Sequence, residues 1–430
     1  MLPSAARHVT GTPARAGGSR LRFSAAAALA AGTALVLAGC SGQTGNARVD
    51  AVEASGDGTL RIGLILDNTG KQSFLNAAQL AAAKLAVQEI NAAGGHKGRP
   101  VELLPEEISE DTAAQAKALV AAKADVVIGP TDSSRAPGAI DVLANGKVAI
   151  ISPANAAHGL SRYRSGGYYF RTSAADVAQA PVLVKMAKDS GARTLAIVHE
   201  EGLYGKDVSA AVAAAAKAAG LGIVADAAFP AGQAQQAAAA AKAAAPDAVV
   251  LVARGGAQGA IAELHNQGLA GSKLILSDGA ISQYGSALGS NALDGARGIL
   301  PGVFPSAHFQ GELVAVDPEL KDMTFAAEAY DAVNLAAIAA AAAQDDAGSS
   351  IAAKLMAVSG GSEGAAACKS YKECADAVKA GKAADYDGES GQVGFDSNGD
   401  VTSANYMVFT YAADNTARMS GRETAARAAG

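Results

Sequence analysis

The strongest constraint on the fold is a regular alternation of short apolar strands and helices. Residues 60–66 form a leucine- and isoleucine-rich run of strand length, and a helical pattern over 76–92 follows it and stops at Gly94-Gly95. We expect further strands at residues 101–104, 124–128, 148–151, 194–198, 222–225, 248–252 and 273–276. We expect further helices at residues 112–123, 136–145, 177–189, 207–219, 233–244, 257–267 and 325–343. Strands that alternate with helices of this length predict βαβ units and parallel sheets.

Two consecutive sets of such units predict an α/β fold with two doubly wound parallel-sheet lobes. The chain has 430 residues, which leaves room for two lobes of ordinary domain size. Half of the residues are hydrophobic, but much of that half is alanine and none is tryptophan. We therefore expect cores of Val, Ile and Leu strands with Ala-rich helices packed close against them. The end of the chain has the pattern of a β-hairpin, in which Asn398-Gly399 suits a tight turn.

The first forty residues have the charge-then-apolar order of a secretory signal. Four arginines precede an apolar stretch over residues 23–36, and no acidic residue occurs in this region. The stretch ends at Leu37-Ala38-Gly39-Cys40, which resembles the bacterial lipobox; an ordinary cleavable signal that ends near a cysteine is the alternative. We predict a signal peptide over 1–39, lipidation at Cys40 and a flexible tether over 40–57. The mature protein would then be anchored by lipid on the extracytoplasmic face of the cell membrane.

Two of the three cysteines remain once Cys40 is assigned to the lipid. Cys368 and Cys374 are close in sequence, which suits a small local disulfide loop in an oxidising compartment. A metal site would need further His or Cys ligands nearby, and the sequence has none there. We therefore predict a disulfide.

Composition and motifs argue against nucleic-acid binding and against catalysis. The formal net charge of −6 does not suit a nucleic-acid partner, which needs a basic face. The stretch Gly360-Gly361-Ser362-Glu363-Gly364 matches a nucleophile elbow formally, but no expected strand precedes it, so we interpret it as a loop. The six histidines are scattered without metal-ligand spacing. We expect no enzymatic activity, no cofactor and no bound metal.

Ligands of open α/β sheets bind beyond the carboxyl ends of the strands, which identifies the loops of interest. These loops cover residues 67–74, 129–134, 152–156, 199–204, 254–257 and 277–280.

The order of short motifs resembles the type I periplasmic binding proteins of the leucine/isoleucine/valine-binding family, the substrate-capturing components of amino-acid ABC transporters. The motifs are Ile62-Gly63-Leu64-Ile65, Ile90-Asn91-Ala92-Ala93-Gly94-Gly95, Val127-Ile128-Gly129-Pro130, Ile151-Ser152-Pro153-Ala154, Phe170-Arg171-Thr172, Tyr204-Gly205, Ser277-Asp278-Gly279, Ala329-Tyr330-Asp331-Ala332 and Tyr386-Asp387-Gly388. Together they extend over essentially the whole mature chain.

The resemblance implies two lobes joined by three crossing strands. The crossings are expected near Thr172, Pro301 and Ser403. One lobe then combines residues 58–172 with 303–402, the other combines 173–302 with 403–415, and 416–430 remain as a polar tail. Similar members carry a small disulfide loop where Cys368 and Cys374 stand.

The resemblance also implies a site for the head group of an amino acid. Ser133 follows a strand and opens an expected helix, so its hydroxyl suits a carboxylate, although a plain helix cap is the alternative. Ala154 matches a position whose backbone groups hold the ligand. Two residues on, this chain has Ala156 where the family usually has a hydroxyl, with Asn155 beside it.

Further contacts are implied from both lobes. Asp278 matches an acidic residue that pairs with the ligand ammonium, and Tyr204 matches an aromatic residue that closes over the ligand. Phe74 and Phe325 are the expected apolar contacts, with Leu75 as a competitor for Phe74.

Two charged residues of these loops favour opposite kinds of ligand. Arg254 favours an additional ligand carboxylate or other acceptor. Asp132, next to Ser133, favours a basic group if it faces the ligand.

These features predict a monomeric solute-binding lipoprotein of an ABC importer. We expect it to capture an amino acid of branched-chain type, or a related small amino or amide compound, in the cleft between the two lobes and to deliver it to a permease. A ligand-sensing receptor component of the same fold is the alternative. Because the chain ends shortly after the expected hairpin, we favour transport over sensing.

Overall fold

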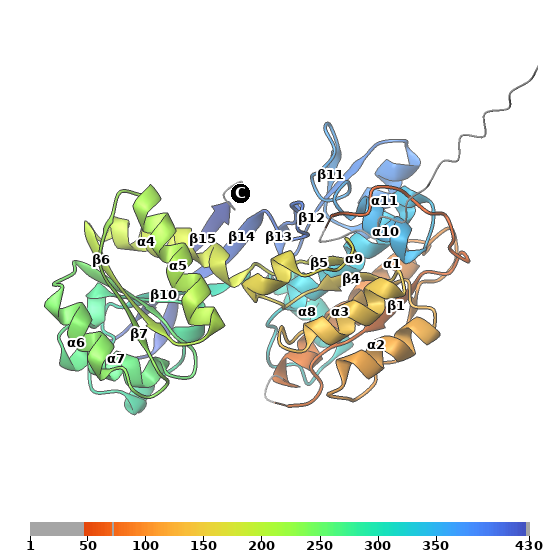
Figure 1. Ribbon diagram of the computed structural model, residues 1–430. Helices are drawn as coiled ribbons and strands as arrows, with labels where there is room; N and C mark the ends of the chain where they lie inside the picture. Colours follow the sequence, from red (N-terminus) through yellow and green to blue (C-terminus); the bar gives the residue numbers. More distant parts are fainter. Residues whose placement is uncertain (1–46, 71–72, 427–430) are drawn as a thin grey trace, which may run out of the picture. The chain divides into compact units, whose positions relative to one another are not determined.

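The computed structural model describes residues 47–70 and 73–426, and the predicted signal peptide and Cys40 lie outside these residues. The first lobe contains a five-stranded parallel sheet of order β2-β1-β3-β4-β5 (Figure 1). Its strands are β1 (Arg61–Leu64), β2 (Glu102–Leu103), β3 (Val126–Ile128), β4 (Ala149–Ser152) and β5 (Tyr169–Arg171).

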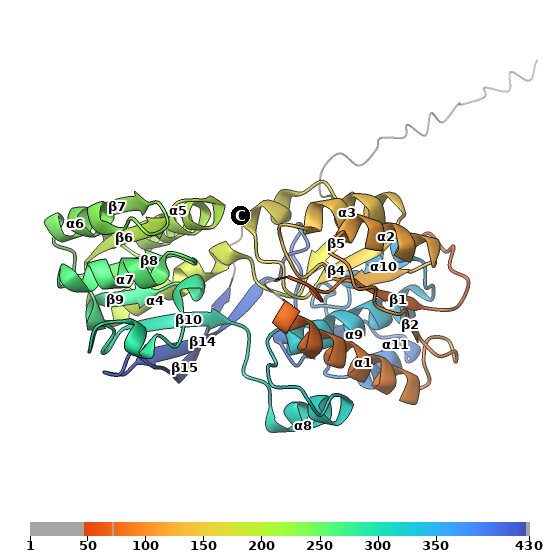
Figure 2. The ribbon, with the colours of Figure 1, turned by 90° about the horizontal axis from the view of Figure 1, so that it is seen from below.

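The second lobe contains a seven-stranded sheet of order β15-β14-β10-β9-β8-β6-β7, which Figure 2 shows strand by strand. Its strands are β6 (Thr194–Glu200), β7 (Gly222–Phe229), β8 (Ala248–Val252), β9 (Leu274–Leu276), β10 (Arg297–Pro301), β14 (Ser403–Tyr411) and β15 (Ala417–Ala426). The strands from β6 to β10 are parallel, whereas β14 and β15 are antiparallel to their neighbours. The sheet is therefore mixed rather than wholly parallel.

Helices cover both faces of each sheet, which is the doubly wound arrangement expected from the sequence. In the first lobe they are α1 (Asn76–Ala92), α2 (Thr112–Ala121), α3 (Ala136–Asn145), α8 (Ala307–Val316), α9 (Ala326–Ala343), α10 (Gly348–Leu355) and α11 (Tyr371–Lys379). In the second lobe they are α4 (Ala180–Asp189), α5 (Leu203–Ala218), α6 (Gln235–Ala243) and α7 (Ala257–Asn266). The short 3-10 turns η1 (Ser73–Leu75) and η3 (Asp176–Gln179) directly precede α1 and α4, and η5 (Asp278–Ala280) follows β9.

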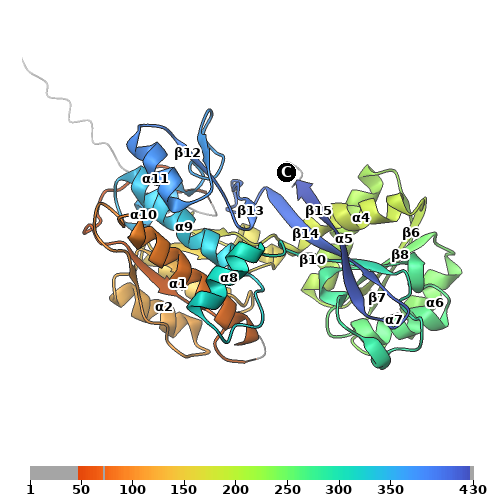
Figure 3. The ribbon, with the colours of Figure 1, turned by 180° about the vertical axis from the view of Figure 1, so that it is seen from behind.

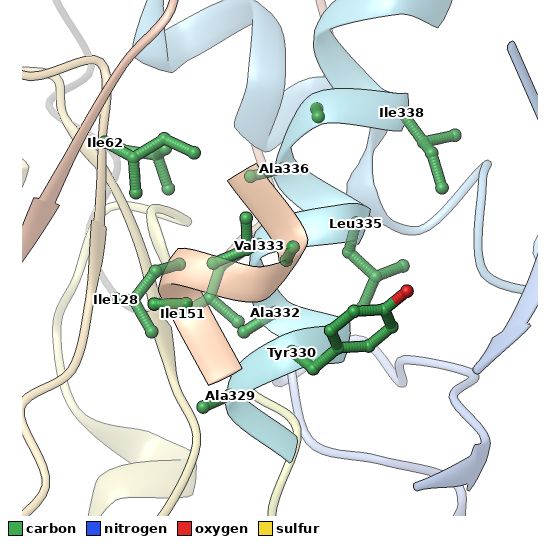
Figure 4. Packing of buried hydrophobic residues seen from close by; sticks show 14 of the residues in the cluster. Ile62, Ile128, Ile151, Ala329, Tyr330, Ala332, Val333, Leu335, Ala336 and Ile338 are labelled. Atoms are coloured by element: carbon green, nitrogen blue, oxygen red, sulfur yellow. The ribbon is translucent and has the colours of Figure 1, made fainter. Parts of the chain in front are cut away.

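The core of the first lobe forms between its sheet and the neighbouring helices α1 and α9, which lie side by side in Figure 3. Ile62, Ile128 and Ile151 extend from three adjacent strands toward Val333 of α9 (Figure 4). Helix α9 is buried along most of its length, and its many alanines allow this close approach. The expected combination of aliphatic strands and Ala-rich helices is therefore present.

Three segments of the chain connect the two sheets. They follow β5 at Thr172, follow β10 at Pro301 and precede β14 at Ser403. The segments bond to one another and to the first lobe: Gly302 donates its N–H to the Asn405 carbonyl, and the Thr172 hydroxyl donates to the Glu328 carbonyl at 2.9 Å.

Cys368 and Cys374 form the predicted disulfide. It joins the end of β11 (Ala366–Cys368) to α11, beside a small three-stranded sheet completed by β12 (Ala384–Gly388) and β13 (Gly391–Gln392).

The expected tether and the expected polar tail both differ from the prediction. Within the tether, the Gly56 N–H donates to the Asp345 carboxylate and the Glu53 carbonyl accepts the Ser350 hydroxyl, so this part of the tether lies against the first lobe rather than apart from it. Within the tail, β15 pairs antiparallel with β14 from Ala417 to Ala426, as a mostly exposed edge strand whose polar and charged residues hide it from a sequence pattern.

The terminal hairpin is thus formed by β14 and β15, not by strands around Asn398-Gly399. Gly399 does adopt the expected positive φ of 79°, within a tight turn closed by the bridge between Phe395 and Val401. In the described part of the chain, none of the helices is both long enough and apolar enough to cross a bilayer.

Candidate ligand-binding site

Tyr204 and Asp278 lie together at the carboxyl edge of the second sheet. Tyr204 is the second residue of α5, directly after β6, and Asp278 opens η5 directly after β9. The Tyr204 hydroxyl donates to Asp278 Oδ1 at 2.5 Å and contacts Ser277 Oγ at 2.9 Å. Burial, and then the charge of Asp278, raise the pKa of Tyr204 well above its usual value, so the phenol stays protonated. The structure therefore brings together two of the residues predicted from this lobe.

Asp176 and Gln179, both in η3, complete this cluster and were not predicted from the sequence. Gln179 Nε2 donates to Asp278 Oδ1 at 2.6 Å, and Gln179 Oε1 accepts the Asp278 N–H at 3.1 Å. The Asp176 side chain is buried. Burial, and then the neighbouring charge of Asp278, raise its pKa to about 6.

Arg254, predicted to favour an additional ligand carboxylate, is already engaged by protein groups. Its Nη2 lies 3.1 Å from Asp176 Oδ1, and its guanidinium lies over the Tyr204 ring at 3.9 Å from the centroid. Arg254 thus pairs with Asp176, whereas the carboxylate of Asp278 is bonded by the uncharged side chains of Tyr204 and Gln179. The arrangement suits a cationic group of a ligand better than an anionic one.

In the first lobe, the Ser133 hydroxyl oxygen accepts two backbone hydrogen bonds, so the hydroxyl can act toward a ligand as a donor. Ser133 Oγ accepts the backbone N–H groups of Ala156 at 3.1 Å and Ala157 at 3.3 Å. A hydroxyl that accepts two such bonds has its remaining capacity as a donor, which suits a carboxylate oxygen. The expectation that Ser133 opens a helix is wrong in detail, because α3 begins only at Ala136, after a turn.

The side chain of Asn155 bonds groups of the protein. Its side chain is fully buried, donates to the Thr131 carbonyl at 2.8 Å and accepts the Tyr169 hydroxyl at 3.1 Å. Its carbonyl oxygen accepts bonds from Arg171 and Ser173. Asn155 therefore shapes the loop that presents its neighbours.

The alanines on either side of Asn155 offer only backbone groups. Ala154 is nearly buried, and its N–H lies 3.4 Å from Ser152 Oγ. The N–H of Ala156 is taken by Ser133, and its carbonyl accepts the Asp176 N–H at 2.7 Å. The loop after β4 is thus bonded both to the loop after β3 and to η3.

The two predicted phenylalanines have different surroundings. Phe74 in η1 is 59% exposed whereas Leu75 is buried, so Phe74 is the residue of this pair that remains accessible. Phe325 precedes α9 with a left-handed φ of 60° and borders a small pocket among the three connecting segments, together with Thr172, Gly302 and Glu328. That pocket lies at the crossings rather than at a sheet edge.

Comparison with known proteins agrees with this architecture. Residues 59–416 match the family model described as periplasmic binding protein. The Leu/Ile/Val-binding protein BraC3 of Rhizobium johnstonii is 33% identical over 179 residues, which cover 40% of this chain and 48% of that protein. The chain thus spans about half the length of the curated relatives that it matches.

Solved structures share the fold at low sequence identity. The substrate-binding protein LivJ of Streptococcus pneumoniae, in complex with isoleucine, superimposes with a TM-score of 0.58 at 22% identity, over 86% of this chain and 100% of that one. A solute-binding protein of an ABC transporter from R. palustris, in complex with benzoate, gives 0.58 at 20% identity, over 86% of this chain and 98% of that one. With two sheets joined by three segments and a family match over most of its length, this chain belongs to the periplasmic binding protein family.

Proposed function

We propose that this protein is the substrate-binding component of an ABC importer, which captures a small amino-acid-like ligand between its lobes and delivers it to a permease. The observation that carries the proposal is the cluster of Asp176, Asp278 and Tyr204 at the carboxyl edge of the second sheet. The buried carboxylate of Asp176 and the half-buried carboxylate of Asp278, next to an aromatic ring, provide charge and apolar surface for an ammonium group. The Leu/Ile/Val-binding relative and the isoleucine complex support an amino acid as the ligand class.

In this proposal each lobe holds one end of the head group. Asp278 and Asp176 pair with the α-ammonium, and the Ser133 hydroxyl donates to the α-carboxylate, next to the backbone of Ala154 and Ala156. Tyr204 covers the ligand from the second lobe, and Phe74 offers apolar surface from the first. A ligand that touches both lobes stabilises the form in which they are closed.

The proposal places the protein outside the cytoplasm, attached to the membrane by lipid at Cys40. The charge order of residues 1–39 and the lipobox-like motif before Cys40 support this location. Mass spectrometry of the membrane fraction would test it, since a diacylglycerol on Cys40 adds a defined mass that a Cys40→Ser variant lacks.

A thermal-shift screen of the purified protein against amino acids, polyamines, amides and aromatic acids tests the ligand class. A ligand that binds only the folded state raises the melting temperature by mass action. We expect Asp278→Ala to weaken binding of an amino acid by about 2 kcal/mol or more, because the buried ammonium loses its partner. Asp294→Asn, an exposed carboxylate before β10, is the matched control with no expected effect. Stabilisation by an aromatic acid and by no amino acid would discard these head-group assignments.

A further inference from the structure

The loop after β1 holds a buried carboxylate that the proposed head-group contacts do not use. Asp67 is only 4% exposed, and its Oδ1 lies 3.7 Å from Arg135 Nη1. Its Oδ2 is buried and, among residues 47–70 and 73–426, has no hydrogen-bond partner. A buried acceptor without a hydrogen bond costs free energy, so a donor that reached this atom would be bound favourably.

The guanidinium beside Asp67 is shared with a second carboxylate. Arg135 Nε lies 3.8 Å from Asp132 Oδ2, while Asp132 Oδ1 accepts the N–H and hydroxyl of Ser134. Both Arg135 separations exceed ordinary hydrogen-bond length, so the guanidinium satisfies neither carboxylate fully. Burial, and then the charge of Asp132, raise the pKa of Asp67 to about 6, which leaves it mostly ionised at neutral pH.

These residues lie at the edge of the sheet that carries the proposed head-group site. β1 and β3 are adjacent parallel strands, paired at Leu64 and Ile128, and their following loops run close together. A Cβ added to Gly129 would lie 2.0 Å from the Ile65 carbonyl oxygen. Asp132 immediately precedes Ser133, so the buried carboxylate borders the position proposed for the ligand carboxylate.

A second unsatisfied polar atom lies in the same loop. The Oγ1 of Thr69 is buried and, within the described residues, has no hydrogen-bond partner. Glu106 is also near this loop, but its carboxylate already accepts the side-chain amides of Asn68 and Asn76. The available acceptors are therefore Asp67 Oδ2 and Thr69 Oγ1.

We infer that Asp67, with Thr69 and Asp132, forms a subsite for a second cationic group of the ligand, a primary ammonium on its side chain. This inference rests on the proposed function and narrows the ligand to a basic amino acid. An ammonium has three N–H donors, which can satisfy both buried acceptors. Its positive charge also adds to that of Arg135, which alone among the described residues lies between the two carboxylates of Asp67 and Asp132. An aliphatic side chain would cover Asp67 Oδ2 without bonding it, at a cost in binding free energy.

The charges of the second lobe agree with a dicationic ligand. There the guanidinium of Arg254 pairs with Asp176, while the neighbouring carboxylate of Asp278 is bonded by the uncharged side chains of Tyr204 and Gln179. Within residues 47–70 and 73–426, each lobe therefore has a carboxylate without a close cationic partner, Asp67 in the first and Asp278 in the second. A ligand with an α-ammonium and a side-chain ammonium, and one carboxylate for Ser133, matches both.

Calorimetry with matched ligands tests the subsite. Lysine and ornithine are compared with norleucine and leucine, because norleucine has the carbon chain of lysine without the ε-amino group. We expect lysine or ornithine to bind at least 30-fold more tightly than norleucine. Asp67→Asn, of nearly the same shape, should remove at least 30-fold of the affinity for the diamino ligand and leave norleucine unchanged.

Further variants separate the subsite from the proposed function. Asp67→Asn should not lower the melting temperature of the ligand-free protein, because the amide removes a buried charge. Thr69→Val should lower affinity for the diamino ligand five- to tenfold, which provides a test even if Asp67→Asn does not fold. Asp141→Asn, an exposed carboxylate of α3, is the matched control.

The two failures have different signatures. Tight binding of leucine or norleucine, with lysine weaker and Asp67→Asn without effect, overturns the subsite and keeps the proposed function. Absence of binding by every amino acid overturns both.

Discussion

The guanidinium of Arg254 lies 3.9 Å from the centre of the Tyr204 ring, although 50 residues separate the two in the chain. The contact joins the loop after β8 to the start of α5. It orients the arginine toward Asp176 and holds the phenol ring in place by its flat face. The positive charge of Arg254, expected from the sequence to favour a ligand carboxylate, is therefore paired with a carboxylate of the protein itself.

Ligand affinity should fall as the pH decreases through 6. The pKa of Asp176 is raised to about 6, so below that pH the carboxyl binds a proton and no longer attracts an ammonium. Calorimetry at pH 7.5, 6 and 5 with the stabilising amino acid measures the loss. Asp176→Asn should bind weakly at all three values. An equal affinity of the unaltered protein at pH 5 and 7.5 would exclude Asp176 from the ammonium site.

The buried ion pair between Arg171 and Asp400 should contribute strongly to stability. Its atoms Nε and Oδ1 are 2.7 Å apart, and both side chains are almost fully buried. Asp400→Asn should lower the free energy of unfolding by about 3 kcal/mol, because an uncompensated guanidinium stays buried. Urea unfolding measures it. The control is Asp376→Asn in the exposed pair with Lys372, where we expect no measurable change.

Glu328 at the crossing pocket should make stability depend on pH. Burial raises its pKa from 4.5 to about 7. The folded protein therefore holds a proton that the unfolded chain releases between these values, and stability is lost as the pH rises through 7. Glu328→Gln should be more stable than the unaltered protein at pH 8, on the order of 3 kcal/mol, and equal to it at pH 4. Denaturant unfolding of both proteins at pH 4 and pH 8 measures the effect. If the difference in free energy of unfolding between the two proteins were the same at both pH values, the assignment to Glu328 would be wrong.

The disulfide should stabilise the fold only moderately. Cys368 and Cys374 are six residues apart, so the bond closes a small loop and removes little entropy from the unfolded chain. Replacing both cysteines with alanine should cost about 2 kcal/mol. Chemical unfolding with and without reductant provides the comparison, and the double variant should be insensitive to the reductant.

The sequence predicts an element well where apolar periodicity and a stop signal coincide. The expected helix over 76–92 agrees with α1, whose apolar run ends before Gly94-Gly95. By contrast, α5 begins at Leu203, four residues before the expected start at Asp207, because the first turn carries Tyr204-Gly205, which has no helix-start signature. β15 was assigned to a polar tail because an edge strand with one solvent face is rich in charged residues.

The sequence predicts the candidate site less completely than the fold. Tyr204 and Asp278 directly follow recognisable strands, so their proximity follows from the parallel sheet. Asp176 and Gln179 lie in a short turn after the first crossing, outside any strand end, and no periodic signal marks them. The pairing of Arg254 with Asp176 depends on three-dimensional proximity alone.

The contacts that hold residues 56 and 58 to Asp345 and Asp346 also limit how far the first lobe can stand from its proposed point of attachment. Arg48 donates to the Tyr169 carbonyl at 2.7 Å, so the chain lies on this lobe from about residue 47 onward. Ala47 follows Cys40 by only seven positions in the chain. A fully extended chain of that length spans about 25 Å, less than the thickness of a lipid bilayer's hydrocarbon core. A lipid on Cys40 would therefore keep the first lobe at the membrane surface, within the reach of a partner embedded there.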